Sequence, residues 1–246
     1  MWDDAKQLNA IARGVALVAL ALLAWAGIGW AARQAPFAFR EVLVTGALVH
    51  VEPAALELIV RRELSGTFFT MNLESARASL AKLPWVRSVS LRRQWPQRLE
   101  VTVEEHVPFG RWNDTALVDT FGGVFTADYD GALPQFAGPA ERAAEVATRY
   151  REAGAALAPL RLEVEAVRLS ARGGWQITAK GPSSRLSIEL GREEPSARLE
   201  RFVAVYERTI GALARAGTTI DHVDLRYRNG FAARVPGFRE RVRKKA

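Results

Sequence analysis

The 246-residue sequence contains no cysteine, and this absence removes several kinds of site at once. Without thiols the chain has no disulfide framework, no cysteine nucleophile and no thiolate ligands for zinc or an iron–sulfur cluster. Histidine is scarce as well. His50, His106 and His222 stand far apart in the sequence, and none has a second ligand at metal-binding spacing. We therefore expect neither a metal centre nor a cofactor.

The common catalytic and nucleotide-binding motifs are also missing. The sequence has no Walker loop, GxGxxG fingerprint, GxSxG elbow or HExxH pair. Ser79 and Lys82 form an SxxK pattern, but the SDN and KTG motifs of penicillin-recognising enzymes do not accompany it. Asp128 and Asp130 lie in a short acidic turn without the ligand spacing of an EF-hand. The chain is predicted not to be an enzyme, with acyl transfer through Ser79 as the alternative.

Positive charge is in modest excess, with 34 Lys and Arg against 27 Asp and Glu and a net charge of +7. The basic residues are spread along the chain, except for a cluster within residues 237–246. A nucleic-acid-binding protein concentrates basic side chains beside groups that read bases, and this tail has no such groups. We expect no nucleic-acid partner and a disordered, solvated tail. Weak attraction of the tail to anionic lipid headgroups is the alternative.

One long apolar run stands near the N-terminus. Gly14 to Ala32 carries no charged side chain, and Arg13 and Arg33 bracket it. A helix that rises 1.5 Å per residue would cross nearly the whole hydrocarbon core of about 30 Å with these residues. The run is predicted to be a single transmembrane helix that follows a short cytoplasmic segment, residues 1–13. A cleaved signal peptide ending at Ala24-Trp25-Ala26 is the alternative, but the apolar run continues beyond that point.

The rest of the chain has the patterns of a mixed, α+β fold. Residues 37–106 predict the order β-α-α-β-β, because β-rich segments with period-two alternation flank two stretches of helical periodicity. The expected strands are 37–45, 86–93 and 99–105, and the expected helices begin at Pro53 and after an Asn72 cap. We expect this region to fold as a domain of its own.

Residues 107–236 predict a second mixed domain with a mainly antiparallel sheet and two helices. The expected strands are 162–169, 175–178, 186–190, a short hairpin within 117–125, and a last hairpin of 223–227 and 231–235. The first helix follows from the stripe Val146 to Leu157, and the second runs from Leu199 to Leu213 and ends at Gly217. Asn229-Gly230 predicts a tight turn in the last hairpin.

Several segments of the chain resemble the FtsQ/DivIB family of bacterial cell-division proteins, whose first extracytoplasmic domain is a POTRA domain. The order β-α-α-β-β after one anchor is similar to that domain. The matching segments are Pro84-Trp85-Val86, Arg92-Arg93-Gln94-Trp95-Pro96, Leu99-Glu100-Val101 and Glu105-His106-Val107-Pro108. Leu133 to Pro139 resembles the family's LPxFxGP turn into a helix, so the resemblance spans nearly the whole chain.

The resemblance implies a scaffold of the division septum. Such a protein lies in the inner membrane with a cytoplasmic N-terminus and a periplasmic body, and it links early and late division proteins. The implied partners are FtsB and FtsL, with FtsK, FtsW and FtsI as further ones, and no small-molecule substrate is implied. A POTRA-type chaperone or docking module of an outer-membrane assembly or secretion system is the alternative function, but the sequence lacks the strands of a downstream barrel.

The same resemblance implies a site near the C-terminus, where FtsB would add a strand to an exposed sheet edge. Arg226 or Arg172 would pair with a carboxylate of FtsB, and Tyr227 would become buried as an amphipathic anchor. The expected binding residues are Arg172, Arg226, Tyr227, Asn229, Gly230, Phe231, Ala232, Ala233, Arg234 and Val235.

Overall fold

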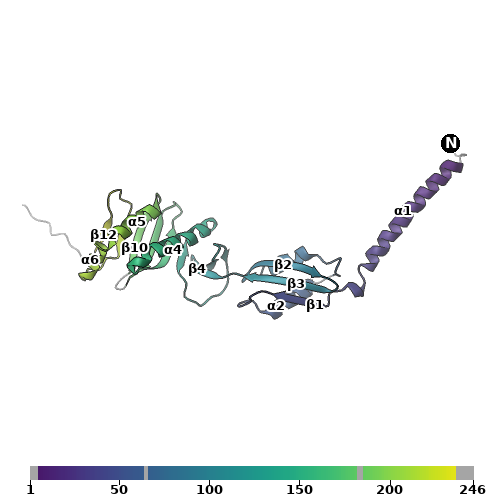
Figure 1. Ribbon diagram of the computed structural model, residues 1–246, viewed down its shortest axis with the longest axis horizontal. Coiled ribbons are helices and arrows are strands. Elements are labelled where there is room, and N and C mark those ends of the chain that lie inside the picture. Colours follow the sequence, from purple (N-terminus) through teal and green to yellow (C-terminus); the bar gives the residue numbers. More distant parts are fainter. Residues whose placement is uncertain (1–4, 64–65, 182–184, 237–246) are drawn as a thin grey trace, which may run out of the picture. The chain divides into compact units, whose positions relative to one another are not determined.

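The computed structural model of the chain describes residues 5–63, 66–181 and 185–236 (Figure 1). The chain divides into two compact units, Met1–Glu105 and His106–Ala246. The basic tail, residues 237–246, lies outside the described residues, so disorder of this tail stays a prediction.

The first element is a long apolar helix, α1, which spans Ala5–Ala31. Its segment Asn9–Ala31 is long and apolar enough to cross a membrane, and none of that segment is buried in the protein. At 1.5 Å per residue these 23 residues span about 34 Å, slightly more than the hydrocarbon core of a bilayer. The helix begins before the predicted Gly14, because no proline or glycine interrupts the polar residues that precede the apolar run.

The first unit continues as a three-stranded sheet with two helices against one face. The elements are the 3₁₀ turn η1 Ala35–Phe37, β1 Glu41–Thr45, α2 Pro53–Glu63, α3 Leu73–Leu80, β2 Val86–Gln94 and β3 Arg98–Glu105. The strand order is β1-β3-β2, with β1 parallel and β2 antiparallel to β3. The predicted order β-α-α-β-β is confirmed. The first strand starts at Glu41 rather than Phe37, because Pro36 lies in the 3₁₀ turn.

Capping and apolar spacing explain the second helix of this unit. The Asn72 side chain accepts hydrogen bonds from the backbone N–H groups of Glu74 and Ser75, as the sequence predicts. Ala76 and Leu80 then lie one helical turn apart and are both buried. The core that the helices and the sheet share contains Val51, Leu56, Val60, Met71, Ala76, Leu80, Val86, Val89, Leu99, Val101 and Val103.

A buried carboxylate holds the connection between β1 and α2. Glu105, at the end of β3, accepts hydrogen bonds from the backbone N–H groups of Val49 and His50 at 3.1 Å and of Val51 at 2.8 Å. Burial raises the pKa of the Glu105 carboxyl, but these hydrogen bonds outweigh burial and leave its pKa below the ordinary value. The ionised form of Glu105 therefore stabilises the first unit.

Replacing this carboxylate should lower the stability of the first unit in a pH-dependent way. We expect Glu105→Gln to cost about 1–3 kcal/mol at pH 7, since charge-assisted hydrogen bonds to buried donors are lost. Because the pKa of Glu105 is lowered by folding, its contribution is complete above the unfolded-state pKa near 4.5 and is lost as the pH falls through the folded-state pKa. Hydrogen exchange of first-unit peptides measures the difference in stability between Glu105→Gln and the unaltered chain. This difference should be smaller at pH 4 than at pH 7. Equal protection of both forms at pH 7 would contradict the assignment.

The second unit is built on a nine-stranded sheet with the order β12-β11-β10-β9-β8-β7-β4-β5-β6. The strands are β4 Pro108–Trp112, β5 Ala116–Asp119, β6 Val124–Phe125, β7 Gln135–Ala137, β8 Glu163–Leu169, β9 Trp175–Lys180, β10 Arg185–Gly191, β11 His222–Asp224 and β12 Ala232–Arg234. Neighbouring strands are antiparallel except in the pairs β4–β7, β7–β8 and β10–β11. The expected α+β class with a mainly antiparallel sheet is therefore present.

Helices and short 3₁₀ turns connect these strands. They are η2 Ala140–Arg142, α4 Ala143–Leu157, η3 Ala158–Leu160, α5 Pro195–Tyr206 and α6 Ile210–Arg215. The prediction of a single helix from Leu199 to Leu213 is wrong, because the helical geometry is interrupted at Thr209. The Thr209 hydroxyl donates a 2.8 Å hydrogen bond to the Val205 carbonyl, and its backbone leaves helical geometry. Gly217 has φ +82° and ends α6, as the sequence predicts.

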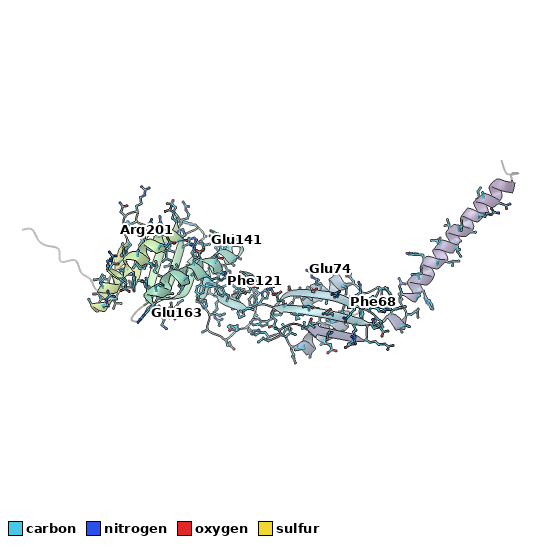
Figure 2. All side chains as sticks on the ribbon, in the orientation of Figure 1. Phe68, Glu74, Phe121, Glu141, Glu163 and Arg201 are labelled. Carbon is cyan, nitrogen blue, oxygen red and sulfur yellow. The ribbon has the colours of Figure 1, made fainter. Side chains whose placement is uncertain are left out.

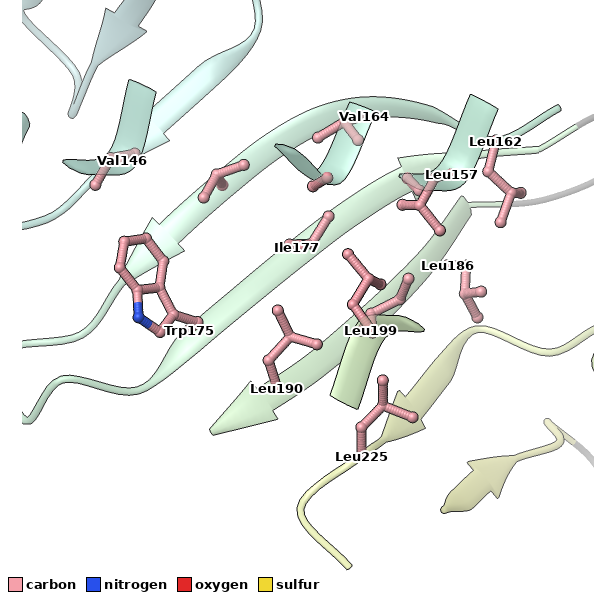
Figure 3. Close-up of a cluster of buried hydrophobic side chains, with 14 of the residues drawn as sticks. Val146, Leu157, Leu162, Val164, Trp175, Ile177, Leu186, Leu190, Leu199 and Leu225 are labelled. Atoms are coloured by element: carbon pink, nitrogen blue, oxygen red, sulfur yellow. The ribbon is translucent and has the colours of Figure 1, made fainter. Parts of the chain in front are cut away.

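The core of the second unit lies between the sheet and helices α4 and α5 (Figure 3). Val146 and Leu157 of α4 and Leu199 of α5 are buried against Ile177 of β9 and Leu190 of β10. This packing fixes α5 beside the strands that lead to the C-terminal edge of the sheet, where the predicted binding residues lie.

Candidate partner-binding edge

Strand β12 lies at one edge of the nine-stranded sheet. Within the described part of the chain it pairs with β11 alone, with Asp224 opposite Ala232, Val223 opposite Ala233 and His222 opposite Arg234. All three β12 residues are exposed. One long side of this strand therefore presents backbone N–H and C=O groups that no other described strand occupies.

The connection between β11 and β12 differs from the predicted tight hairpin. The strands end and begin at Asp224 and Ala232, so residues 225–231 form a loop instead of a two-residue turn. Neither Asn229 nor Gly230 has the positive φ that a type I′ turn requires. The reason lies at the start of the loop, because the Leu225 N–H donates to the Glu189 carbonyl of β10 at 2.8 Å.

Arg226 is held by an acidic residue of its own chain. Its guanidinium group forms a bidentate pair with Asp224, with Nε–Oδ1 at 2.9 Å and Nη2–Oδ2 at 2.7 Å, and its backbone N–H donates to Oδ1 at 3.0 Å. These interactions lower the pKa of the Asp224 carboxyl and raise the pKa of Arg226. Arg234 of β12 is paired in the same way with Asp221. Both arginines are therefore already paired within the chain, and these pairs hold the loop and β12 in place.

An apolar groove of about 570 Å³ runs between the loop and α5. Its floor contains the fully buried Phe202, whose ring packs against Phe231 at 5.7 Å between centroids. Tyr227 and Val205 line the groove and are 58% and 38% exposed. The groove thus offers aromatic surface that a partner can cover, and its lining residues Gly230 and Phe231 lead directly into β12.

Arg172 lies at the same end of the sheet as Arg226. It stands in the exposed turn between β8 and β9 and forms no ion pair with any described residue. The register places Trp175 opposite Gly191 and Glu189 beside Asp224, so the turn and the start of the 225–231 loop share one sheet end. The structure therefore brings Arg172 to the same sheet end as the loop, although β10 and β11 lie between its turn and β12.

The remaining predicted residues divide between the loop, the strand and the core. Asn229 and Gly230 line the groove, and Ala232, Ala233 and Arg234 form β12. Val235 follows the strand and packs, half-buried, against the core of the second unit.

Sequence reasoning missed the contribution of α5 to this site. Arg198, Arg201 and Val205 line the groove from that helix, and Figure 2 labels Arg201. The spacing of i, i+3 and i+7 places these three residues on one stripe beside the buried stripe of Leu199 and Phe202. Projecting the predicted helix onto a wheel would have found them.

In the described part of the chain, the residues of the alternative acyl-transfer and metal sites do not come together to form such sites. Ser79 lies in the last turn of α3 and Lys82 follows that helix, and no hydrogen bond between their side chains is formed. No group of three or more His, Cys, Asp or Glu residues in the described ranges has the geometry to hold a metal ion. The C-terminal edge is thus the best-formed candidate site.

A membrane-length helix followed by a β-α-α-β-β unit and a β-rich second unit defines a class of single-pass membrane proteins with a POTRA domain. Comparison with known families agrees, since residues 37–106 match the POTRA domain of FtsQ type and residues 110–226 match the C-terminal domain of cell division protein FtsQ/DivIB. The chain therefore belongs to the FtsQ family of cell division proteins.

Individual relatives match over most of their length. The cell division protein FtsQ of Burkholderia pseudomallei is 39% identical over 246 residues, which cover 97% of this chain and 96% of that protein. The FtsQ of Nitrosospira multiformis is 37% identical, over 95% of this chain and 99% of its own. The FtsQ of Escherichia coli is 32% identical, over 85% of this chain and 76% of its own. The family therefore implies a role in cell division with other division proteins as partners.

Proposed function

We propose that the chain is a non-enzymatic scaffold of the division septum that captures FtsB, together with FtsL, by strand addition at β12. Family membership supports the role in division. The observation that carries the mode of capture is the exposed β12, which directly follows the loop that lines the apolar groove. FtsK, FtsW and FtsI would be further partners of the same scaffold.

Strand addition accounts for both affinity and selectivity at this edge. An extended segment of FtsB would exchange backbone hydrogen bonds with the free side of β12. Because side chains alternate along a strand, every second residue of that segment would face the groove side of the sheet. An aromatic or branched side chain there would cover Tyr227 and fill the space above Phe202.

The charges around the edge favour a partner with acidic residues. Arg172, Arg201 and Arg228 are exposed and form no ion pair within the described part of the chain. Arg226 and Arg234 are already paired with Asp224 and Asp221. We therefore assign the recognition of partner carboxylates mainly to Arg172, Arg201 and Arg228, with Arg226 holding the loop in place.

The topology that fits this function has α1 in the inner membrane, a cytoplasmic N-terminus and both folded units in the periplasm. Helix α1 has the length and composition for a single crossing. FtsB would then meet the edge outside the cytoplasm, at the septum, and the chain would link proteins that arrive early and late in division.

A crosslinking scan tests this proposal. A photoreactive amino acid is placed at each position from Arg226 to Val235 of the full chain in growing cells. We expect crosslinks to FtsB from the loop and from β12, with yields that alternate along the strand. The matched control is Leu213 of α6, which is exposed but does not line the groove.

Two results would reject the proposed capture. One is the absence of FtsB crosslinks from β12 and the loop while Leu213 gives them. The other is a crosslink to an outer-membrane barrel protein instead of FtsB, which would favour a docking module of an outer-membrane assembly system.

A further inference from the structure

A second exposed aromatic surface lies in the first unit. Phe37, Phe68, Phe69 and Trp95 form a cluster, which we call the juxtamembrane aromatic cluster, and Figure 2 labels Phe68 in it. The ring centroids are 5.2 Å apart for Phe37 and Phe69, 5.3 Å for Phe68 and Phe69, and 5.5 Å for Phe68 and Trp95. Phe69 is 54% exposed and Trp95 is 64% exposed. Phe37 and Phe68 are half-buried, whereas Phe69 and Trp95 are left exposed.

Hydrogen bonds tie this cluster to the end of α1. The Thr67 hydroxyl donates to the Ala32 carbonyl at 2.5 Å, directly after the last helical residue. The Phe68 N–H donates to the Phe37 carbonyl at 2.7 Å. The Arg40 N–H donates to the Gln97 carbonyl at 2.9 Å. Residues 32–40 are therefore hydrogen-bonded to the turn at Thr67 and to the β2–β3 turn, and they do not form a free linker.

This attachment determines the depth of the cluster relative to a bilayer. The membrane-length segment ends at Ala31, and Trp30, 68% exposed, sits one residue before that end. The headgroup layer adds roughly 5–7 Å on each side of the hydrocarbon core. This thickness is about the diameter of one aromatic ring, so a ring just beyond the end of the helix lies within the layer. The Thr67–Ala32 hydrogen bond thus places Phe68 and Phe69 close to the layer in which Trp and aromatic rings accumulate.

The charges beside the cluster have the sign that anionic headgroups attract. Arg33 and Arg40 are exposed on the connection and form no ion pair with a described residue. Glu41, the first residue of β1 after this connection, is acidic but is paired with Arg98 at 2.6 Å. Basic side chains near a membrane surface contribute about 1 kcal/mol each with anionic lipid.

We propose that the juxtamembrane aromatic cluster inserts into the lipid headgroup layer beside α1, so that the membrane itself is the ligand of this end of the first unit. Phe69 and Trp95 enter the layer, and Arg33 and Arg40 contact lipid phosphates. The cluster then limits the tilt of the first unit relative to the membrane. The proposal requires α1 to cross the membrane, but it is independent of FtsB and of the β12 edge.

The absence of cysteine makes a direct depth measurement possible. The full chain is reconstituted into vesicles of phosphatidylcholine with about 30% phosphatidylglycerol, an anionic lipid that attracts basic side chains. A bimane label is attached to a single introduced cysteine. Gln94→Cys places the label at an exposed position beside Trp95, and Val49→Cys places it at a position that is 80% exposed, beyond the opposite end of β1. Quenching by brominated lipid is then compared with quenching by aqueous iodide.

We expect brominated lipid to quench the label at Gln94 about threefold more than the label at Val49, since only the former lies in the headgroup layer. Adding Phe69→Ser and Trp95→Ser should reduce quenching at Gln94 to the level at Val49, with circular dichroism confirming that both forms are folded. Equal lipid quenching at the two positions in the otherwise unaltered chain would overturn the proposal and leave a protein partner as the occupant of the cluster. FtsB crosslinking at β12 reports on the other proposal independently.

Discussion

Truncating Tyr227 to alanine is expected to weaken capture of FtsB by about 2 kcal/mol or more, which is roughly a 30-fold rise in Kd. The reason is the position of this ring. Tyr227 is 58% exposed beside a groove floored by Phe202, so a bound strand would cover aromatic surface that now faces solvent. Removing the ring takes away that buried contact and leaves β12 unchanged.

Titration of the full chain in nanodiscs with the FtsB–FtsL complex measures this effect. Tyr227→Phe should retain most of the affinity, because it keeps the ring. Leu213→Ala should leave the affinity unchanged, because Leu213 is 43% exposed but lies outside the groove. Equal affinity of Tyr227→Ala and the unaltered chain would remove Tyr227 from the site.

Replacing Phe202 by alanine should have the largest effect on stability, a loss of about 3–5 kcal/mol in the second unit. Phe202 is 1% exposed and packs against Tyr206 at 5.5 Å and Phe231 at 5.7 Å between ring centroids. The cavity left by the missing ring lies between α5 and the loop, so binding at the groove should fall with stability. Hydrogen exchange of second-unit peptides measures the loss without mixing it with unfolding of the first unit.

Val205→Ala is the matched control for this substitution. Val205 lines the same groove from the same helix but is 38% exposed, so its truncation should change stability by less than about 1 kcal/mol. We expect Val205→Ala to reduce FtsB affinity while second-unit exchange stays the same. Protection of the second unit that is unaffected by Phe202→Ala would contradict the packing described for the groove.

Elements with long periodic patterns were predictable from the sequence, and short or locally overridden elements were not. The alternation in 99–105 and the stripe from Val146 to Leu157 specify β3 and α4 because many residues repeat the same signal. Strand β7, Gln135–Ala137, was missed because three residues between a proline and a glycine show no period. The break at Thr209 was missed because the apolar stripe continues across it without interruption.

The candidate site could be predicted in its location more fully than in its geometry. The β12 edge follows from a final β-rich segment, but the partners of its arginines do not. The pairs Asp224–Arg226 and Asp221–Arg234 depend on where the loop leaves the sheet, and the Leu225–Glu189 hydrogen bond determines that point. The family resemblance implied that Arg226 or Arg172 pairs with a partner carboxylate, whereas in the structure Arg226 is paired with Asp224 of its own chain.

The shortness of the β11–β12 ribbon has a consequence for how a captured protein would be retained. Only three residue pairs join β12 to the rest of the sheet, so this strand is expected to be the first to fray. A guest segment hydrogen-bonded on the other side would hold β12 between two neighbours and suppress that fraying. Occupancy would therefore stiffen β12, because fraying of this strand would require breaking two ladders instead of one.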